Sequence, residues 1–254
     1  MLLSCRAVLF DCDGVLVDSA ASVRAAWARW AQKLGLDAEE VYRLVHGRRS
    51  EDTVALLVPE ARRAEEVARI DRLEIEDAPS VRAVKGARDL VASIPEDRWA
   101  VVTSGRRELA LARLAAAGLP APRVMVSAED VVMGKPDPEG YKAAALRMGL
   151  ATSATVVVED SVAGAKAARA AGAKAVVGVG DEVGEAGADV VVKDLSWLRW
   201  TGTGLEVHQG ARSDDGRSPA GHEGPLGRRD LLVAERLAPK EGAAEGQEAP
   251  GLER

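Results

Sequence analysis

The chain has 254 residues, a formal net charge of -6, 47% hydrophobic residues and 29% charged residues. This length supports a sizeable core in one or two domains, and the composition is ordinary for a soluble globular protein. The apolar stretches are too short to cross a bilayer, and the negative charge argues against nucleic acid or a membrane surface as a partner.

Both cysteines, Cys5 and Cys12, lie on or beside the first predicted strand. Two cysteines in these positions do not make a disulfide framework or a metal cluster. The residues before Cys5, MLLS, contain neither the basic nor the apolar segment of a signal peptide, so we expect none. We therefore expect a cytoplasmic protein in a reducing environment.

Short apolar runs, which are typical of buried strands, alternate along the chain with alanine-rich segments of helical spacing. This alternation predicts an α/β fold with a Rossmann-like parallel sheet and helices on both faces. In such sheets, ligands bind outside the carboxyl ends of the strands. The predicted strands are residues 7–10, 99–102, 123–126, 155–158, 175–179 and 189–192, and the helices between the later strands are residues 108–117, 140–148 and 162–171.

One segment interrupts the alternation directly after the first strand. It contains no convincing strand and at least three helical patterns, including residues 20–34 and 59–76. An insert at this point overhangs the ends of the strands, so it is a candidate lid. We therefore predict an α/β core made of residues 1–16 and 85–207, with a helical cap made of residues 17–84.

The last part of the chain, residues 208–254, differs in composition from the rest. It is rich in glycine, proline and mixed charge and has few apolar anchors. Such a segment cannot bury enough apolar surface to order itself, so we predict a disordered tail. Within it, residues 229–237 could form one short helix.

Polar side chains stand where the predicted strands end. Asp11 and Asp13 follow the first strand, and Gly14 then allows a sharp turn. Carboxylates at the end of a core strand are costly unless a cation or a reaction neutralises them. An EF-hand calcium loop counted from Asp11 would need an acid at its twelfth position, where Ser22 stands, and it would not follow a strand.

Four strings, FDCDGVLVDS, VVTSG, GKPDP and VVVEDSVAGAKAARAAG, resemble in order the four motifs of the haloacid dehalogenase superfamily, over residues 5–192. The insert is similar to the small helical cap of its sugar-phosphatase branch. Within that branch, WAVVTSGRRELA and HGRRSED resemble the phosphatases of glycerol phosphate and 2-deoxyglucose 6-phosphate. The resemblance implies a Mg²⁺-dependent phosphatase that hydrolyses a small sugar or polyol phosphate through an aspartyl-phosphate.

The resemblance also implies roles for individual residues. Asp11 would be the nucleophile, and Asp13 would protonate the leaving alkoxide and then deprotonate water. Thr103 and Lys135 would hold the phosphoryl oxygens, as would Ser104 unless it only caps the next helix. The Mg²⁺ ligands would be Asp11, the backbone carbonyl of Asp13 and Asp160, with Glu159 either coordinating or behind them, while the cap residues that meet the substrate would be His46 and Arg49, unless they belong to a solvated basic face.

Several rival activities stay open. A dehalogenase would lack the acid at Asp13, and a phosphonate hydrolase would need a lysine near the start of the cap, where only the more distant Lys33 is found. A sugar phosphomutase is the closest rival, although relatives of that kind carry a cap histidine where Val23 stands. A catalytically silent binding or regulatory protein is a further alternative. The sequence leaves open the particular substrate, the oligomeric state and the role of the tail.

Overall fold

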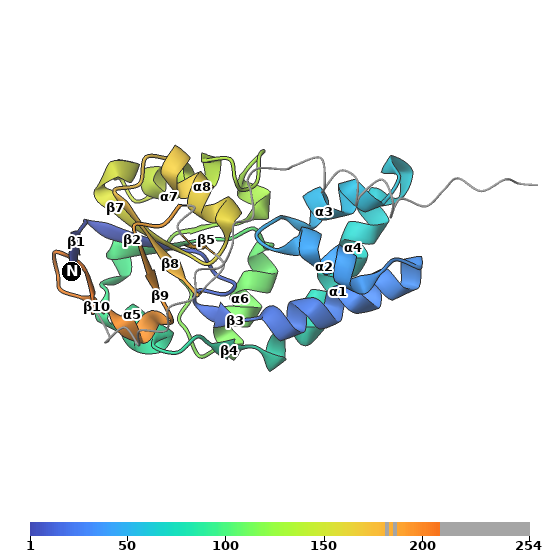
Figure 1. The fold of residues 1–254 in the computed structure, drawn as a ribbon, viewed down its shortest axis with the longest axis horizontal. Coiled ribbons are helices and arrows are strands. Elements are labelled where there is room, and N and C mark those ends of the chain that lie inside the picture. Colours follow the sequence, from blue (N-terminus) through green and yellow to red (C-terminus); the bar gives the residue numbers. More distant parts are fainter. Residues whose placement is uncertain (181–182, 185–186, 209–254) are drawn as a thin grey trace, which may run out of the picture.

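The computed structural model describes residues 1–180, 183–184 and 187–208. The predicted disordered tail therefore lies outside the described residues, apart from His208. A parallel sheet flanked by helices occupies one half of the molecule, and a body of four helices, α1 to α4, occupies the other half (Figure 1). None of the helices in the described part of the chain is long and apolar enough to span a membrane.

The main sheet has six parallel strands in the order β6-β5-β2-β7-β8-β9. Strand β2 lies in the middle, where its last residue, Phe10, pairs with Val101 of β5 and with Val158 of β7. The chain order reverses at this point, which opens a crevice at the carboxyl ends of the strands. The six strands are β2 (Ala7–Phe10), β5 (Trp99–Val102), β6 (Met125–Val126), β7 (Thr155–Glu159), β8 (Ala175–Val179) and β9 (Val190–Val192).

Helices cover both faces of this sheet, because alternate residues of each strand point to opposite sides. In β2, Leu9 faces one apolar cluster with α7 and α8, whereas Val8 and Phe10 face another with α5 and α6. The predicted α/β fold is thus confirmed, with small shifts at the ends of elements. These helices are α5 (Ala87–Ser93), α6 (Arg107–Ala116), α7 (Glu139–Arg147) and α8 (Val162–Ala170).

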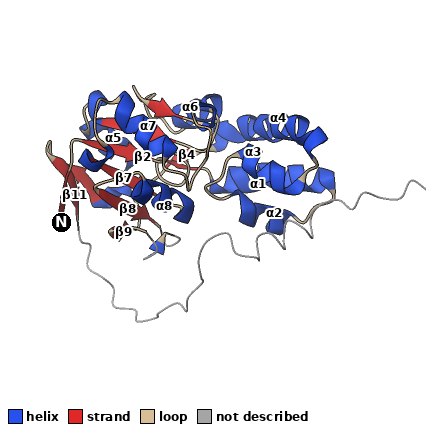
Figure 2. Cartoon of the chain, turned by 90° about the horizontal axis from the view of Figure 1, so that it is seen from above, coloured by secondary structure: helices blue, strands red, loops and turns tan. Residues whose placement is uncertain are grey.

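The four helices of the insert pack around an apolar cluster of their own, beside the carboxyl ends of the strands (Figures 1 and 2). At its centre, Trp27 and Trp30 meet edge to face with 5.2 Å between ring centroids, and both are buried. The cap boundaries at residues 17–84 stay a prediction. The helices are α1 (Ala20–Leu34), α2 (Ala38–Val45), α3 (Ser50–Leu57) and α4 (Glu60–Asp77).

Two small antiparallel sheets were not predicted. In the first, β3 pairs with β4 where the chain enters and leaves the helical insert. In the second, β1 pairs with β11, which also pairs with β10, so both ends of the described chain meet at one edge of the molecule. Their bounds are β3 (Val17–Asp18), β4 (Arg82–Ala83), β1 (Leu2–Ser4), β10 (Leu198–Trp200) and β11 (Gly204–Val207).

Candidate active site

The carboxyl edge of the central sheet brings Asp11 and Asp160 together. Asp11 directly follows β2 and is 7% exposed, and Asp160 directly follows the neighbouring strand β7. Between them Gly14 has a φ of 80°, and a Cβ on it would lie 1.7 Å from the Oδ2 atom of Asp160. Only glycine therefore allows the turn after β2 to lie against the carboxylate of Asp160.

Lys135 reaches this edge from the loop before α7. Its ammonium donates hydrogen bonds to Asp11 Oδ1 at 2.5 Å, to Glu159 Oε1 at 2.6 Å and to the carbonyl of Val102 at 3.2 Å. Burial alone would lower the pKa of Lys135, but the carboxylates of Asp11 and Glu159 outweigh it and raise the pKa above its ordinary value. The lysine is thus a fixed cation within the acidic cluster.

The carboxylate of Glu159, on β7, is fully buried, and donors surround both of its oxygens. Oε1 accepts hydrogen bonds from Lys135 and from the hydroxyl of Tyr141 at 2.6 Å, and Oε2 accepts from the N–H and hydroxyl of Ser161. Burial would raise its pKa, yet Lys135 and the hydrogen bonds lower it. This arrangement favours Glu159 as the residue that orients Lys135, and not as a direct ligand of a metal ion.

Asp11, Glu159 and Asp160 each offer a carboxylate oxygen, and the three oxygens lie within 4.8 Å of one another. Burial raises the pKa of both Asp11 and Asp160 well above its ordinary value, and repulsion among the acids adds to the effect. A divalent cation would relieve this cost, since hard oxygen ligands are those that Mg²⁺ prefers. The residues present therefore fit a Mg²⁺ ion.

Asp13 points to a different set of partners. Its Oδ1 atom accepts hydrogen bonds from the hydroxyl of Ser19 at 2.6 Å and from Nη1 of Arg113 at 2.8 Å. Ser19 occupies the N-cap position of α1, but its side chain makes no capping hydrogen bond. Nη2 of Arg113 in turn donates to Glu74 of the insert at 3.1 Å, and burial, partly offset by Arg113, raises the pKa of Glu74 to about 7.

Sequence reasoning missed Arg113 and Glu74, although a signal for both was present. Arg113 shares the buried face of α6 with Leu109, and Glu74 follows Ile70 by one turn on α4. A charged side chain on the apolar face of a helix needs a partner, because an unpaired buried charge is costly. Here the two residues pair with each other.

The two hydroxyls after β5 have different partners. The Thr103 hydroxyl oxygen accepts a hydrogen bond from the N–H of Gly105 at 3.0 Å, and the side chain is buried beside the acids. Ser104 does not cap the following helix, whose N-cap is Arg106. Its hydroxyl instead donates to the carbonyl of Gly47 at 3.0 Å and so joins the insert to the sheet.

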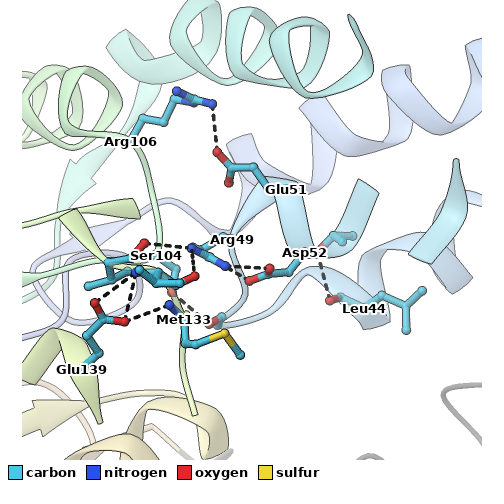
Figure 3. Close-up of polar contacts among 12 residues, drawn as sticks. Leu44, Arg49, Glu51, Asp52, Ser104, Arg106, Met133 and Glu139 are labelled. Carbon is cyan, nitrogen blue, oxygen red and sulfur yellow. Dashed lines mark hydrogen bonds and ion pairs between the residues drawn. The ribbon is translucent and has the colours of Figure 1, made fainter. Parts of the chain in front are cut away.

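A cavity of about 690 Å³ opens above the carboxyl edge, between the sheet and the helical insert. His46 lines it, with its Nε2 atom 3.8 Å from Asp160 Oδ2. Arg49 instead borders a smaller neighbouring cavity, where it bonds to Asp52 and to two backbone carbonyls (Figure 3). The large cavity is lined from the core by Asp11, Asp13, Thr103, Ser104, Arg113 and Asp160, and from the insert by Val23, Trp27, Tyr42, His46, Arg48 and Glu74.

The chain is similar to known proteins both in sequence and in structure. Residues 5–172 match the family described as haloacid dehalogenase-like hydrolase, so the resemblance seen in the sequence is confirmed. A solved hydrolase from Pseudomonas syringae, 26% identical, superposes with a TM-score of 0.66 over 75% of this chain and 94% of that one.

Two characterised relatives share much of the chain. Hexitol phosphatase A from Escherichia coli is 42% identical over 178 residues, which cover 67% of this chain and 81% of that protein. Glycerol-1-phosphate phosphohydrolase 2 from Saccharomyces cerevisiae is 31% identical over 224 residues, which cover 82% of this chain and 89% of that protein.

Proposed function

We propose that this chain, which belongs to the haloacid dehalogenase-like hydrolase family, is a phosphatase that hydrolyses a small sugar or polyol phosphate. The observation that carries this proposal is the meeting of Asp11, Asp13 and Lys135 at the carboxyl edge, beside a cavity of about 690 Å³ that is large enough for a small phosphate ester. The names of the relatives, a hexitol phosphatase and a glycerol-1-phosphate phosphohydrolase, support the substrate class.

In the proposed first step, a carboxylate oxygen of Asp11 attacks phosphorus and the bond from phosphorus to the alkoxide breaks. Asp13 gives its proton to the departing oxygen, and an aspartyl-phosphate remains on Asp11. In the second step, Asp13 takes a proton from water as the water attacks phosphorus and frees Asp11. Lys135 and Thr103 hold the phosphoryl oxygens and offset their negative charge.

Mg²⁺ is the proposed cofactor. Asp11, Asp160 and the backbone carbonyl of Asp13 would hold it, and when bound it would offset the repulsion between an anionic nucleophile and an anionic phosphate. Glu159 keeps the ammonium of Lys135 in place beside Asp11, as its hydrogen bonds indicate.

A sugar phosphomutase is the alternative with the most similar chemistry. Such an enzyme passes the phosphoryl group back to a sugar hydroxyl instead of to water. Val23 stands where mutase-like relatives carry a cap histidine, and it lines the cavity with an aliphatic side chain. This observation supports transfer to water.

The test is release of inorganic phosphate from hexitol phosphates, glycerol phosphates and 2-deoxyglucose 6-phosphate, with Mg²⁺ and with chelator. We expect Mg²⁺-dependent release that Asp11→Asn abolishes. Transfer from a sugar bisphosphate without net release would instead indicate a mutase. Binding of the esters with neither release nor transfer would indicate a silent binding protein.

The cytoplasm is the proposed location. Cys5 and Cys12 are both buried and unpaired, as expected for a protein in a reducing compartment. The proposed partner is the small phosphorylated sugar or polyol substrate.

A further inference from the structure

We propose that Arg49 is a positioning residue that fixes the loop carrying Lys135, and so acts on the chemical step through that loop. This inference rests on the proposed function and assigns Arg49 a role other than the substrate contact expected from the sequence. The loop consists of residues 131–135, and Arg49 is the N-cap residue of α3 in the helical insert.

The guanidinium of Arg49 contacts the loop directly. Nη1 donates hydrogen bonds to the carbonyl of Val131 at 3.3 Å and to the carbonyl of Val132 at 3.1 Å (Figure 3). The side chain is only 14% exposed. A charged donor that is largely withdrawn from water makes stronger hydrogen bonds than an exposed one.

Asp52 sets the orientation of this guanidinium. Its two carboxylate oxygens accept from Nε and Nη2 of Arg49 at 2.8 and 2.9 Å, the bidentate geometry that holds an arginine plane in one position. Because Arg49 and Asp52 both belong to the insert, the pair forms there and presents Nη1 to the core. The pair of Arg49 and Asp52 therefore links the insert to the core.

The backbone of the loop leaves room for the pair of Arg49 and Asp52. A Cβ on Gly134 would lie 2.8 Å from Nε of Arg49 and 2.9 Å from Oδ2 of Asp52, so glycine leaves the room that the pair occupies. From the other side, the carboxylate of Glu139 accepts from the N–H groups of Val132 and Met133 (Figure 3). The backbone just before Lys135 is thus held from both sides.

Other contacts between the insert and the core lead elsewhere. Ser104 meets the carbonyl of Gly47, and Arg106 pairs with Glu51 at 2.8 Å, so both contacts hold the turn after β5 (Figure 3). Arg49 instead contacts the loop that carries Lys135. A displacement of about 1 Å at a catalytic group can cost roughly 100-fold in rate, so a looser loop affects the chemical step.

A comparison of Arg49→Met with Arg43→Met tests the inference. Arg43 is a matched control, since it is an exposed arginine of the same insert, on α2 and outside the cavity lining. We expect Arg49→Met to lower kcat about 10- to 100-fold, by the same factor for a hexitol phosphate, glycerol phosphate and p-nitrophenyl phosphate, with little change in KM. Arg43→Met should match the wild type.

Hydrogen exchange of the backbone amides supplies a readout that does not depend on activity. Arg49→Met should speed exchange at Val132 and Met133, whereas Arg43→Met should leave it unchanged. Asp52→Asn, which keeps the charge of Arg49 but weakens its orientation, should shift kcat and exchange in the same direction by less. This second variant keeps the test open if Arg49→Met folds poorly.

Two results would overturn the inference. One is a rise in KM that depends on the leaving group with kcat unchanged, since this would make Arg49 a substrate contact. The other is unchanged exchange at Val132 and Met133 in Arg49→Met. If the wild type releases no phosphate, the proposed function fails, whereas the exchange comparison still decides whether Arg49 fixes the loop.

Discussion

The carboxyl edge of the sheet and the insert that covers it differ in how their charged groups are held. At the edge, the side chains of Lys135, Asp11 and Glu159 are 7%, 9% and 0% exposed and bond to one another. On the insert, His46 is 42% exposed, and the pair between Glu51 and Arg106 is about 40% exposed on both sides. The charged groups at the edge are thus withdrawn from water and held by their mutual pairing, whereas these groups at the insert are well exposed to solvent.

The most severe test of this comparison replaces the proposed nucleophile. Asp11→Asn should lower phosphate release by a factor of about 1,000 or more, because the covalent step loses its attacking oxygen. Steady-state phosphate release with Mg²⁺ measures the effect, and circular dichroism checks the fold. A residual rate within tenfold of the wild type would contradict the assignment of Asp11.

Removing the ammonium group of Lys135 should reveal how strongly the buried carboxylates depend on their ion pairs. Lys135→Met leaves the carboxylates of Asp11 and Glu159 without their common partner, which should destabilise the metal-free protein by about 3–5 kcal/mol. Urea unfolding at neutral pH, in the presence of chelator, measures the change. A loss below about 1 kcal/mol would mean that the edge tolerates unpaired acids and is not distinct from the surface.

The contact between Glu74 of the insert and Arg113 is as buried as the carboxyl edge, and the stability of the protein should depend on pH through Glu74. The pKa of Glu74 is raised from its ordinary value of 4.5 to about 7, first by burial. Burial therefore favours the protonated form of Glu74 in the folded protein. The stability that this protonated form contributes is fully present below pH 4.5 and is lost as the pH rises through 7.

Glu74→Gln removes this titration. From pH 5 to pH 8, the free energy of unfolding of the wild type should fall relative to the variant by on the order of 1–3 kcal/mol. Urea unfolding of both proteins at the two pH values measures the difference. Parallel curves would show that Arg113 keeps Glu74 ionised throughout this range.

The smallest effect is expected at the exposed end of the comparison. Glu51→Gln breaks the pair with Arg106, in which both side chains are about 40% exposed, and should change the free energy of unfolding by about 1 kcal/mol or less. The effect should shrink further in high salt, which screens exposed charges. A salt-independent loss of several kcal/mol would mean that this pair behaves like the buried edge.

The strands and the acids at their ends could be predicted because each depends on a local pattern. The run before Asp11 is apolar on both faces, which is typical of a central strand of a parallel sheet. The short strands β1 and β11 could not be found in this way, since the three residues of β1 are all partly or fully exposed and pair with a strand that lies at the other end of the described residues.

The partners of individual polar groups were also beyond the sequence. A hydroxyl such as that of Ser104 can cap a helix or bond to a distant carbonyl with equal chemistry, and only the fold brings Gly47 within reach. Similarly, Arg49 carries the same donors whether it meets a phosphate or the carbonyl of Val132. Position in space, rather than residue type, separates these alternatives.

The antiparallel pair of β3 and β4 has a consequence for how such a protein can be rebuilt. Val17 lies opposite Ala83 and Asp18 opposite Arg82, so the insert leaves and rejoins the core at neighbouring points. A turn of about two residues can join such strands, and chains tolerate insertions where the ends lie close together. We therefore expect that the insert can be exchanged for another segment while the register of the main sheet stays the same.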